Sequence, residues 1–387
     1  MTWAQTPSPP TAPVADAAGP RTVLVLAPSA GNPRNSEGDF IRLRDGRLLF
    51  IYTRFSGGSS DHDTAVLVSR VSHDQGQTWS PEDQPVLANE GGWNVMSVSL
   101  LRLQDGRIAL FYLRKNSATD CRPLLRYSAD EAASWSEPLE MISDAETGYY
   151  VLNNDRVIQL SSGRLVAPVA LHHRPDWQRP DWLGQVMCYC SDDAGLTWHR
   201  SQNVLQGHAG GDPAGARIAA QEPGVVELSD QRLMLWVRTN AGEQYRAYST
   251  DRGETWSALE PMKVASPQSP ASIERVPGGN DLLMVWNDHT DRAVNERTVR
   301  TPLSVAISRD DGSTWTPARR IADDPQGWYC YTAIDFVDDL VLLGYVAGRQ
   351  APGQHLATSQ ITRVPIAWCD ASPSAGTATA ADHNSAQ

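Results

Sequence analysis

Short apolar runs alternate with polar turns along most of this chain, and one arrangement of them returns six times. A polar turn leads into an apolar run rich in β-branched and aromatic residues, which is typical of a turn followed by a buried strand. Another strand-like segment precedes each turn, and no segment has a convincing helical period. The six turn-and-strand segments are DGRLLFIYT at Asp45, DGRIALFYL at Asp105, SGRLVAPVA at Ser162, DQRLMLWVR at Asp230, GNDLLMVWN at Gly279 and DDLVLLGYV at Asp338. The pattern predicts an all-β protein.

A second motif, S-x-D-x-G-x-T-W, follows five of these segments, and we call it the Asp-turn. It occupies residues 72–79, 191–198, 249–256 and 308–315, and a decayed copy at 128–135 has Ala132 in place of the glycine. Ser and Asp side chains bond the backbone amides of a turn, Gly provides a positive φ, and the Trp begins the next strand. We therefore interpret the Asp-turn as a staple of a β-hairpin and not as a catalytic site.

The spacing of the Asp-turns predicts a repeat architecture. Their central aspartates, at positions 74, 130, 193, 251 and 310, are 56, 63, 58 and 59 residues apart. Each unit of this length reads as a four-stranded antiparallel meander, and six such units can bury both faces by closing into a six-bladed β-propeller. We expect one propeller domain over residues 21–369, with the apolar run at 21–28 completing the last blade. Residues 1–20 and 370–387 have compositions typical of disordered segments.

Composition narrows the range of partners. The net charge of −12 argues against nonspecific binding to nucleic acid or to an anionic membrane, so an anionic ligand requires a local arginine cluster. The five cysteines are an odd number without framework spacing, which favours free and mostly buried thiols. No run approaches the length of a membrane span, and the start lacks the features of a secretory signal. We expect a cytoplasmic protein, or a secreted one if its true start lies elsewhere.

Position within a propeller predicts which residues share a site. The first strand of each blade lines the central channel, and the mouth is formed by the starts of these strands and by the loops after the second strands. Strand-one starts provide Arg34, Glu37, Arg156, Glu222 and Tyr331; strand-two ends provide Arg54, His172 and Arg238; the following loop of blade one provides Asp61 and Asp63; and Arg300 opens strand three of blade five.

These segments resemble the sialidase (neuraminidase) superfamily over about residues 30–368. The stretch QEPGVVELSDQRLMLWVR resembles the part of bacterial sialidases that holds a catalytic-site glutamate and the second of three arginines. The resemblance implies these roles for Glu222 and Arg238. The blade-five stretch VRTPLSVAIS resembles the one leading to the third arginine, which implies Arg300. The segment YCYTAI resembles the nucleophile element, which implies that Tyr331 is the nucleophile.

Such a group of residues suits a sugar that carries its own carboxylate. A neutral phenol avoids the repulsion that a carboxylate nucleophile would meet, and a glutamate can take its proton. Arginines bind the sugar carboxylate through bidentate, charge-assisted bonds. A loop aspartate, Asp61 or Asp63, would serve as the general acid. The hypothesis is a retaining exo-glycosidase of sialidase type acting on an acidic glycan, with no cofactor and no metal.

The chain departs from the family pattern in two blades. In blade one, SEG at 36–38 replaces an R-I-P element, and the nearest arginine, Arg34, stands two residues earlier on the same strand face. In blade three, Asp155 and Arg156 stand where the family tends to have glycines. We expect Glu37 to bond Arg34, Arg54 or a sugar hydroxyl. We also expect both departures to face the site, so the favoured sugar would be a modified nonulosonic acid or a uronic acid, not plain N-acetylneuraminic acid.

Two alternatives remain open from the sequence. One is a polysaccharide lyase or hydrolase for uronic acids, which the cluster of Tyr149, Tyr150, His172 and His173 favours. The other is a glycan-binding propeller without catalysis, against which the pair Glu222 and Tyr331 argues. Arg54 could also have a purely structural role, as a residue at the rim of the channel paired with Asp61 or Asp63. His172 and His173 with Cys188 and Cys190 match no standard zinc spacing.

Overall fold

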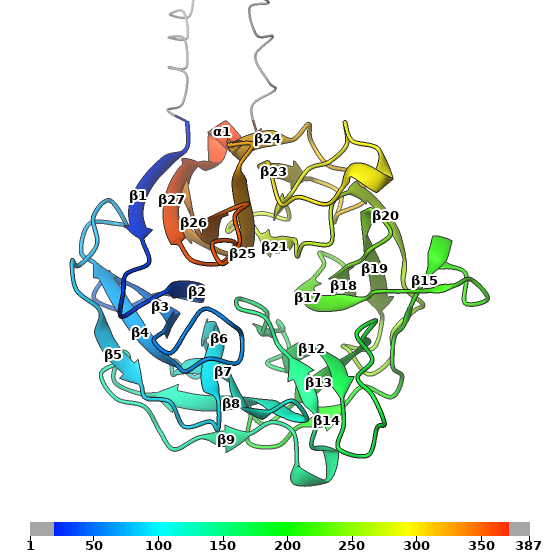
Figure 1. Ribbon diagram of the computed structural model, residues 1–387, viewed down its shortest axis with the longest axis horizontal. Coiled ribbons are helices and arrows are strands. Elements are labelled where there is room, and N and C mark those ends of the chain that lie inside the picture. Colours follow the sequence, from blue (N-terminus) through cyan, green and yellow to red (C-terminus); the bar gives the residue numbers. More distant parts are fainter. Residues whose placement is uncertain (1–18, 371–387) are drawn as a thin grey trace, which may run out of the picture.

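Six blades surround a central axis in the computed structural model, which describes residues 19–370 (Figure 1). Blades one, four, five and six are separate four-stranded antiparallel sheets. Blades two and three are joined into one nine-stranded sheet because β10 pairs in parallel with β8 at Tyr149 and Cys121. The expected six-bladed β-propeller is confirmed. The terminal segments expected to be disordered, 1–20 and 370–387, lie almost entirely outside the described residues.

The strands follow one another around the ring in chain order. Blade one contains β2 (Arg34–Arg42), β3 (Leu48–Phe55), β4 (Ala65–Ser72) and β5 (Gln84–Leu87); blade two contains β6 (Asn94–Arg102), β7 (Ile108–Ser117), β8 (Asp120–Ser128) and β9 (Leu139–Glu140); and blade three contains β10 (Tyr149–Val151), β11 (Ile158–Gln159), β12 (Leu165–His173), β13 (Gln185–Ser191) and β14 (His199–Arg200). Blade four contains β17 (Gln221–Glu227), β18 (Leu233–Arg238), β19 (Glu243–Ser249) and β20 (Glu260–Ala265); blade five contains β21 (Ser272–Arg275), β22 (Leu282–Trp286), β23 (Leu303–Ser308) and β24 (Arg319–Ala322); and blade six contains β25 (Gly327–Val337), β26 (Leu340–Arg349) and β27 (Ser359–Pro365).

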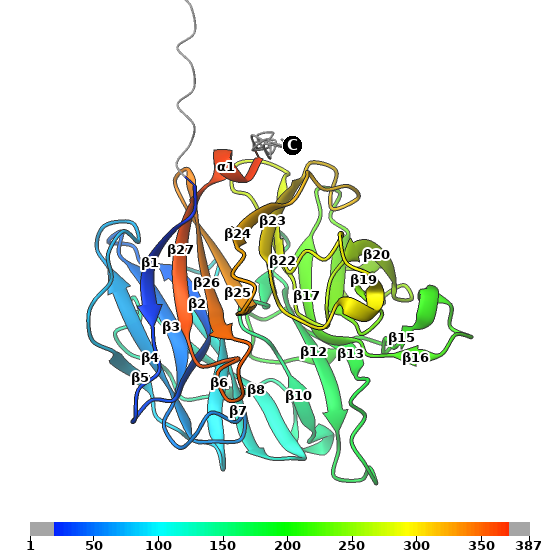
Figure 2. The ribbon, with the colours of Figure 1, turned by 45° about the horizontal axis from the view of Figure 1, so that its top comes forward.

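Few elements lie outside the blades. A small hairpin of β15 (Gly207–His208) and β16 (Arg217–Ile218) projects from the side of the ring (Figure 2). Short 3₁₀ turns occur at η1 (Asp144–Glu146), η2 (Ala209–Gly211) and η3 (Val294–Glu296), and α1 (Ile366–Asp370) follows β27. Within residues 19–370, no helix is both long and apolar enough to cross a membrane. All five cysteines are free and buried, as expected.

The first described strand closes the ring. β1 (Arg21–Leu26) pairs antiparallel with β27, so the last blade is built from both ends of the chain. Leu26 is buried among Phe40 and Phe50 of blade one and Leu342 of blade six. Similar apolar clusters fill the space between each pair of neighbouring blades across the described residues. The strand therefore removes a sheet edge and seals the seam between blades six and one.

The Asp-turns have the staple geometry expected from their sequence. In the first copy, the Ser72 hydroxyl donates to Asp74 and accepts from the amide of Gly76, each at 2.8–2.9 Å. The other carboxylate oxygen of Asp74 accepts from the Thr78 hydroxyl at 2.6 Å. The decayed copy keeps the same bonds, and Ala132 takes φ +64° in place of a glycine. These aspartates lie at the hairpins and not at the channel mouth, so their role is structural.

Candidate active site

Backbone bulges direct the candidate side chains toward the channel. The register between the first and second strands shifts in blades one, two, four and six, so that two residues oppose one. In each blade the first bulged residue has a left-handed backbone, with φ between +51° and +59°; these residues are Glu37, Ser97, Glu222 and Tyr331. A bulge turns a side chain out of the alternation of a strand. The same local device therefore places chemically different side chains around one axis.

Tyr331 and Glu222 meet across the channel. The Tyr331 hydroxyl donates to Glu222 Oε1 at 3.1 Å, and Arg238 Nη1 lies 2.6 Å from Glu222 Oε2. Arg238 is held in turn by Gln221, whose amide oxygen accepts from Nε and Nη2. Burial, and then the charge of Glu222, raises the pKa of Tyr331 far above its usual value. The phenol is therefore neutral, and the carboxylate that can accept its proton is already in contact with it.

Two more arginines surround the same phenol. The guanidinium carbon of Arg300 lies 5.7 Å from the centre of the Tyr331 ring and 5.3 Å from that of Trp328. Arg34 also interacts electrostatically with Tyr331. The structure therefore brings Tyr331, Glu222 and the three expected arginines together. This concentration of positive charge in an acidic protein suits an anionic group bound beside the phenol.

Both terminal nitrogens of Arg34 bond the protein's own carboxylates. Its Nη1 donates to Asp61 Oδ1 at 2.5 Å and its Nη2 to Glu37 Oε1 at 3.2 Å. Glu37 also accepts from the hydroxyls of Ser36 and Ser97. Burial raises the pKa of Glu37, although Arg34 opposes the shift. The expectation that Glu37 would bond Arg34 is confirmed, so the unusual carboxylate of blade one orients an arginine.

The two loop aspartates lie in different places. Asp61 contacts Arg34, whereas Asp63 accepts from the amide of Ser60 at 2.8 Å within its own loop. Partial burial would raise the pKa of Asp61, but the charges of Arg34 and then Lys115 outweigh it and hold the pKa below its usual value. Of the two aspartates, only Asp61 has a carboxylate that is hydrogen-bonded to an arginine of the candidate site, Arg34.

Arg54 does not reach the site. Phe55 lies beneath the guanidinium of Arg34, and neighbouring residues of a strand point to opposite faces. Arg54 accordingly points the other way, toward Asp83 at 3.5 Å, which also accepts from Tyr52 and Arg70. The interpretation of Arg54 as a partner of Asp61 or Asp63 is therefore wrong, and its placement among the substrate-binding residues has no support in the geometry.

The blade-three residues do not narrow the site as expected. Arg156 is buried in the channel, where its guanidinium donates to Ala271 O at 2.8 Å, to Asp155 O and to Ser272 Oγ. Asp155 accepts from the amide of Ile334 at 2.9 Å and lines a cavity that does not contain Tyr331 or Glu222. Asp155 therefore lies away from Tyr331 and Glu222, contrary to the expectation. Arg156 interacts electrostatically with Glu222, although its hydrogen bonds all go to the protein itself. The sequence shows the charged residues Asp155 and Arg156, but it does not show the direction of the backbone after β10, which decides where their side chains point.

His172 does belong to the site's surroundings. It is buried and interacts electrostatically with Arg238 and Glu222, and its Nδ1 lies 3.1 Å from Asp181 O. Burial lowers its pKa, so the imidazole is neutral at pH 7. Its ring lies 5.5 Å from that of Trp182, a side chain with 57% of its surface exposed.

Two neighbouring residues, Lys115 and Trp182, were not among the predicted site residues. Lys115 is buried, donates to Asp61 O at 3.0 Å, and has its ammonium 5.3 Å from the centre of the Tyr149 ring. Its position at the end of a second strand is the same signal that pointed to Arg238. Trp182 lies in the long β12–β13 connection, RPDWQRPDWLG, where an unusual length and two tryptophans were the available signal.

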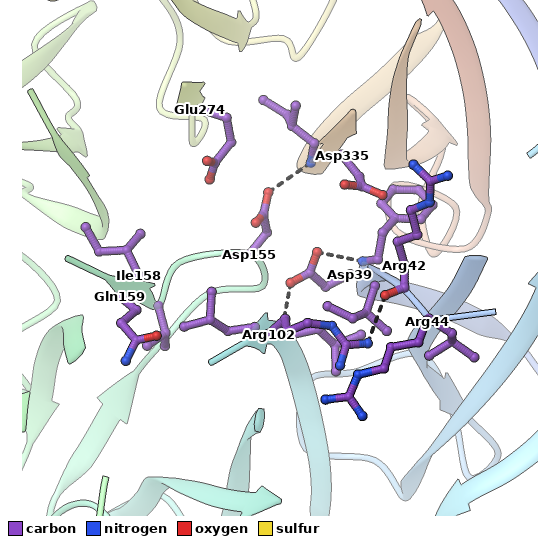
Figure 3. A pocket seen from close by; sticks show the side chains of 16 residues that line it. Asp39, Arg42, Arg44, Arg102, Asp155, Ile158, Gln159, Glu274 and Asp335 are labelled. Atoms are coloured by element: carbon purple, nitrogen blue, oxygen red, sulfur yellow. Dashed lines mark hydrogen bonds between the residues drawn. The ribbon is translucent and has the colours of Figure 1, made fainter. Parts of the chain in front are cut away.

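A second concentration of carboxylates lies at the opposite ends of the inner strands. Figure 3 shows this cavity of about 610 Å³, which Asp39, Asp155, Glu274 and Asp335 line from four different blades. Burial raises the pKa of all four, to about 6 for Asp155 and for Asp335. Across residues 19–370 there is no group of three or more side chains arranged to hold a metal ion, and this cluster is no exception.

Comparison with known proteins agrees with the architecture. Residues 46–343 match the family model of the BNR repeat-like domain. The chain belongs to the sialidase/BNR-repeat superfamily. A sialidase of Bacteroides fragilis (strain YCH46) is 28% identical over 226 residues, which cover 56% of this chain and 37% of that enzyme. The matched part thus spans well under two thirds of the relative's length.

Solved sialidase structures have the same fold as this BNR-repeat chain. A Hadza microbial sialidase superimposes with a TM-score of 0.67 at 18% identity, over 87% of this chain and 66% of that one. A Trypanosoma rangeli sialidase, in complex with the inhibitor DANA, gives a TM-score of 0.64 at 15% identity, over 86% and 55% of the two chains. At these identities the likeness shows the fold alone.

Proposed function

We propose that this protein is a retaining exo-glycosidase of sialidase type that removes a terminal acidic sugar from a glycan. The observation that carries the proposal is the contact between the Tyr331 hydroxyl and Glu222, with Arg34, Arg238 and Arg300 around it. A neutral phenol beside a proton acceptor is the nucleophile that suits a sugar whose own carboxylate repels anions.

The proposed reaction has two steps. In the first, the Tyr331 oxygen bonds the anomeric carbon while its proton passes to Glu222, and Asp61 protonates the leaving glycan oxygen as that bond breaks. In the second, water attacks the anomeric carbon, Asp61 accepts its proton, and the phenolate leaves and recovers its proton from Glu222. The three arginines hold the substrate carboxylate through both steps.

The site also bears on the choice of sugar. Of the two departures that favoured an unusual acidic sugar, only Glu37 lies beside the arginines, and it is already paired with Arg34. The buried ammonium of Lys115 adds a further positive charge beside Asp61 that favours a substrate with additional acidic or hydroxyl groups. A modified nonulosonic acid therefore remains our proposal over plain N-acetylneuraminic acid.

Product analysis on a panel of acidic glycans tests this function. The expected result is release of one free acidic sugar with retained anomeric configuration. Release of N-acetylneuraminic acid from sialyllactose, faster than any other sugar of the panel, would support the glycosidase and contradict the proposed sugar. Binding without release would favour a glycan-binding propeller instead.

A lyase for uronic acids is a second candidate because a neutral imidazole, His172, lies beside the Glu222–Arg238 pair. Such a base can abstract a proton next to a carboxylate that arginines neutralise. The same panel separates the two reactions, since a lyase leaves an unsaturated sugar that absorbs in the ultraviolet and a hydrolase does not.

A further inference from the structure

The side chain of Asp61 separates the Arg34 guanidinium from solvent. Only 1% of its surface is exposed, while 54% of the Asp61 side chain is exposed above it. One terminal nitrogen of Arg34 donates to Asp61 Oδ1 and the other to Glu37 and Ser36. A ligand carboxylate cannot reach this guanidinium while the Asp61 carboxylate occupies it.

The two carboxylates on Arg34 are held very differently. Glu37 is buried, and both of its oxygens are bonded, by Ser36, Ser97 and Arg34. The Asp61 carboxylate has Arg34 as its one hydrogen-bond donor among the described residues, and it lies at the solvent edge. Of the two carboxylates, that of Asp61 is therefore the one that can move away from Arg34.

The backbone beneath Asp61 is fixed, so its departure needs only a side-chain rotation. Asn94 Nδ2 donates to Asp61 O at 2.9 Å and to Asp63 O at 2.7 Å, and Lys115 Nζ donates to Asp61 O at 3.0 Å. Asn94 and Lys115 are directly opposite each other on β6 and β7. The ring of His62 lies 4.2 Å from that of Trp93 and adds a further contact with blade two. Released from Arg34, the carboxylate stays at the mouth of the site.

We propose that Asp61 is a placeholder for the substrate carboxylate, which displaces it from Arg34 and thereby turns it into the protonated general acid of the reaction. This inference rests on the proposed function. The charged and titratable groups around Asp61 come from five parts of the chain: Arg34 and Glu37 on β2, His62 and Asp63 in its own loop, Lys115 on β7, Cys121 on β8 and Tyr149 on β10.

The sign of the proton change follows from the exchange. In the free protein Arg34 and Lys115 hold the pKa of Asp61 below its usual value, so Asp61 is ionised at pH 5. In the complex Asp61 loses its bond to Arg34 and gains a neighbouring substrate carboxylate, and both changes raise its pKa. Binding of an acidic sugar near pH 5 is therefore accompanied by proton uptake at Asp61.

Calorimetric titration of the full chain with DANA and with glucuronate, near pH 5 in two buffers of different ionisation enthalpy, tests the placeholder. Asp61→Ala and Asp61→Asn should bind the probes about three- to tenfold more tightly than the wild type, because no internal carboxylate competes. The wild type should take up a fraction of a proton when it binds a probe, and neither Asp61 variant should do so. Asp63→Asn is the matched control, since it removes a charge from the same loop but not from Arg34; it should behave as the wild type does.

Each other outcome overturns the placeholder. Equal or weaker binding by both Asp61 variants, unchanged proton uptake, or equal tightening in Asp63→Asn would show that Asp61 does not compete for Arg34. Absence of binding of both probes to the wild type and to both variants would do the same. None of these results affects the release of product from the glycan panel. The proposed glycosidase activity is therefore tested independently of the placeholder.

Discussion

The hydroxyl of Tyr331 lies 3.1 Å from Oε1 of Glu222, and the second oxygen of that carboxylate lies 2.6 Å from Arg238. The two residues come from blades six and four, 109 positions apart in the chain. The contact gives the phenol proton a defined acceptor, and Arg238 fixes the orientation of that acceptor.

Replacing the phenol oxygen tests its role as nucleophile. Tyr331→Phe should lower kcat by roughly 10³-fold or more on the glycan from which the wild type releases an acidic sugar, since the covalent step loses its attacking atom. Its melting temperature should stay close to that of the wild type. Tyr329→Phe, two residues away on the same strand, is the control and should keep most of the activity. Near-normal turnover by folded Tyr331→Phe would exclude this mechanism.

The proposed role of Asp61 as general acid can be separated from a role in binding by changing the leaving group. Asp61→Ala should lose about 10²- to 10⁴-fold in kcat on natural glycans, whose alkoxide leaving groups need a proton. On an aryl glycoside of the same sugar the loss should be much smaller, because a phenolate departs without protonation. Parallel kinetics on the two substrates measure the difference. An equal loss on both would place Asp61 outside proton transfer.

Two arginines that the sequence predicts to bind substrate, Arg300 and Arg54, should respond differently to substitution. Arg300→Met should raise KM for the acidic sugar by about 10- to 100-fold, because a charge-assisted bond to its carboxylate is lost. Arg54→Met should change KM less than about twofold, since Arg54 faces Asp83 on the other side of the blade. Steady-state kinetics on both variants check this. A large effect in Arg54→Met would contradict its placement.

The carboxylates of the cavity in Figure 3 should make stability fall toward neutral pH. Their folded-state pKa values are raised, so they favour the folded state at low pH and lose that contribution as pH rises through about 6. We expect the melting temperature to decrease from pH 5 to pH 7.5. Asp335→Asn should flatten this slope, and Asp291→Asn, at an exposed position, should not. A melting temperature that rises over this range would contradict the expectation.

The closing strand offers a matched pair of neighbours. Leu26→Asp places a charge between blades six and one and should cost about 3 kcal/mol or more of unfolding free energy. Val25→Asp should cost less than about 0.5 kcal/mol, because Val25 is 55% exposed on the other face of β1. Chemical denaturation of both variants gives the comparison. Equal effects would show that β1 does not seal the ring.

The architecture could be predicted because its signals are local and repeated. The alternation of residues in strands and the bonds of the Asp-turn are properties of short segments, and six copies reinforce each other. The pairing of Glu222 with Tyr331 could also be expected, because both stand at the start of an inner strand and resemble family motifs.

The errors arose where a side chain's direction depends on a backbone detail. Arg54 stands one residue from Phe55, and that single step places it on the opposite face of blade one. Asp155 was expected at the mouth, but the chain between β10 and β11 turns its carboxylate toward Ile334 and the far cavity. Lys115 stands at the end of a second strand, but nothing in the sequence shows that Asp61 O would lie within its reach.

The left-handed bulges have a consequence for stability as well as for the proposed reaction. A side chain other than glycine at positive φ costs about 1 kcal/mol or more, and Glu37, Glu222 and Tyr331 each bear that strain. These three side chains also concentrate buried polar atoms near the axis. Glycine at position 222 or 331 would relieve the backbone strain, but it would also remove a side chain on which the proposed reaction depends. Backbone strain and the proposed chemistry thus lie at the same positions, so at these positions stability and activity would be traded against each other.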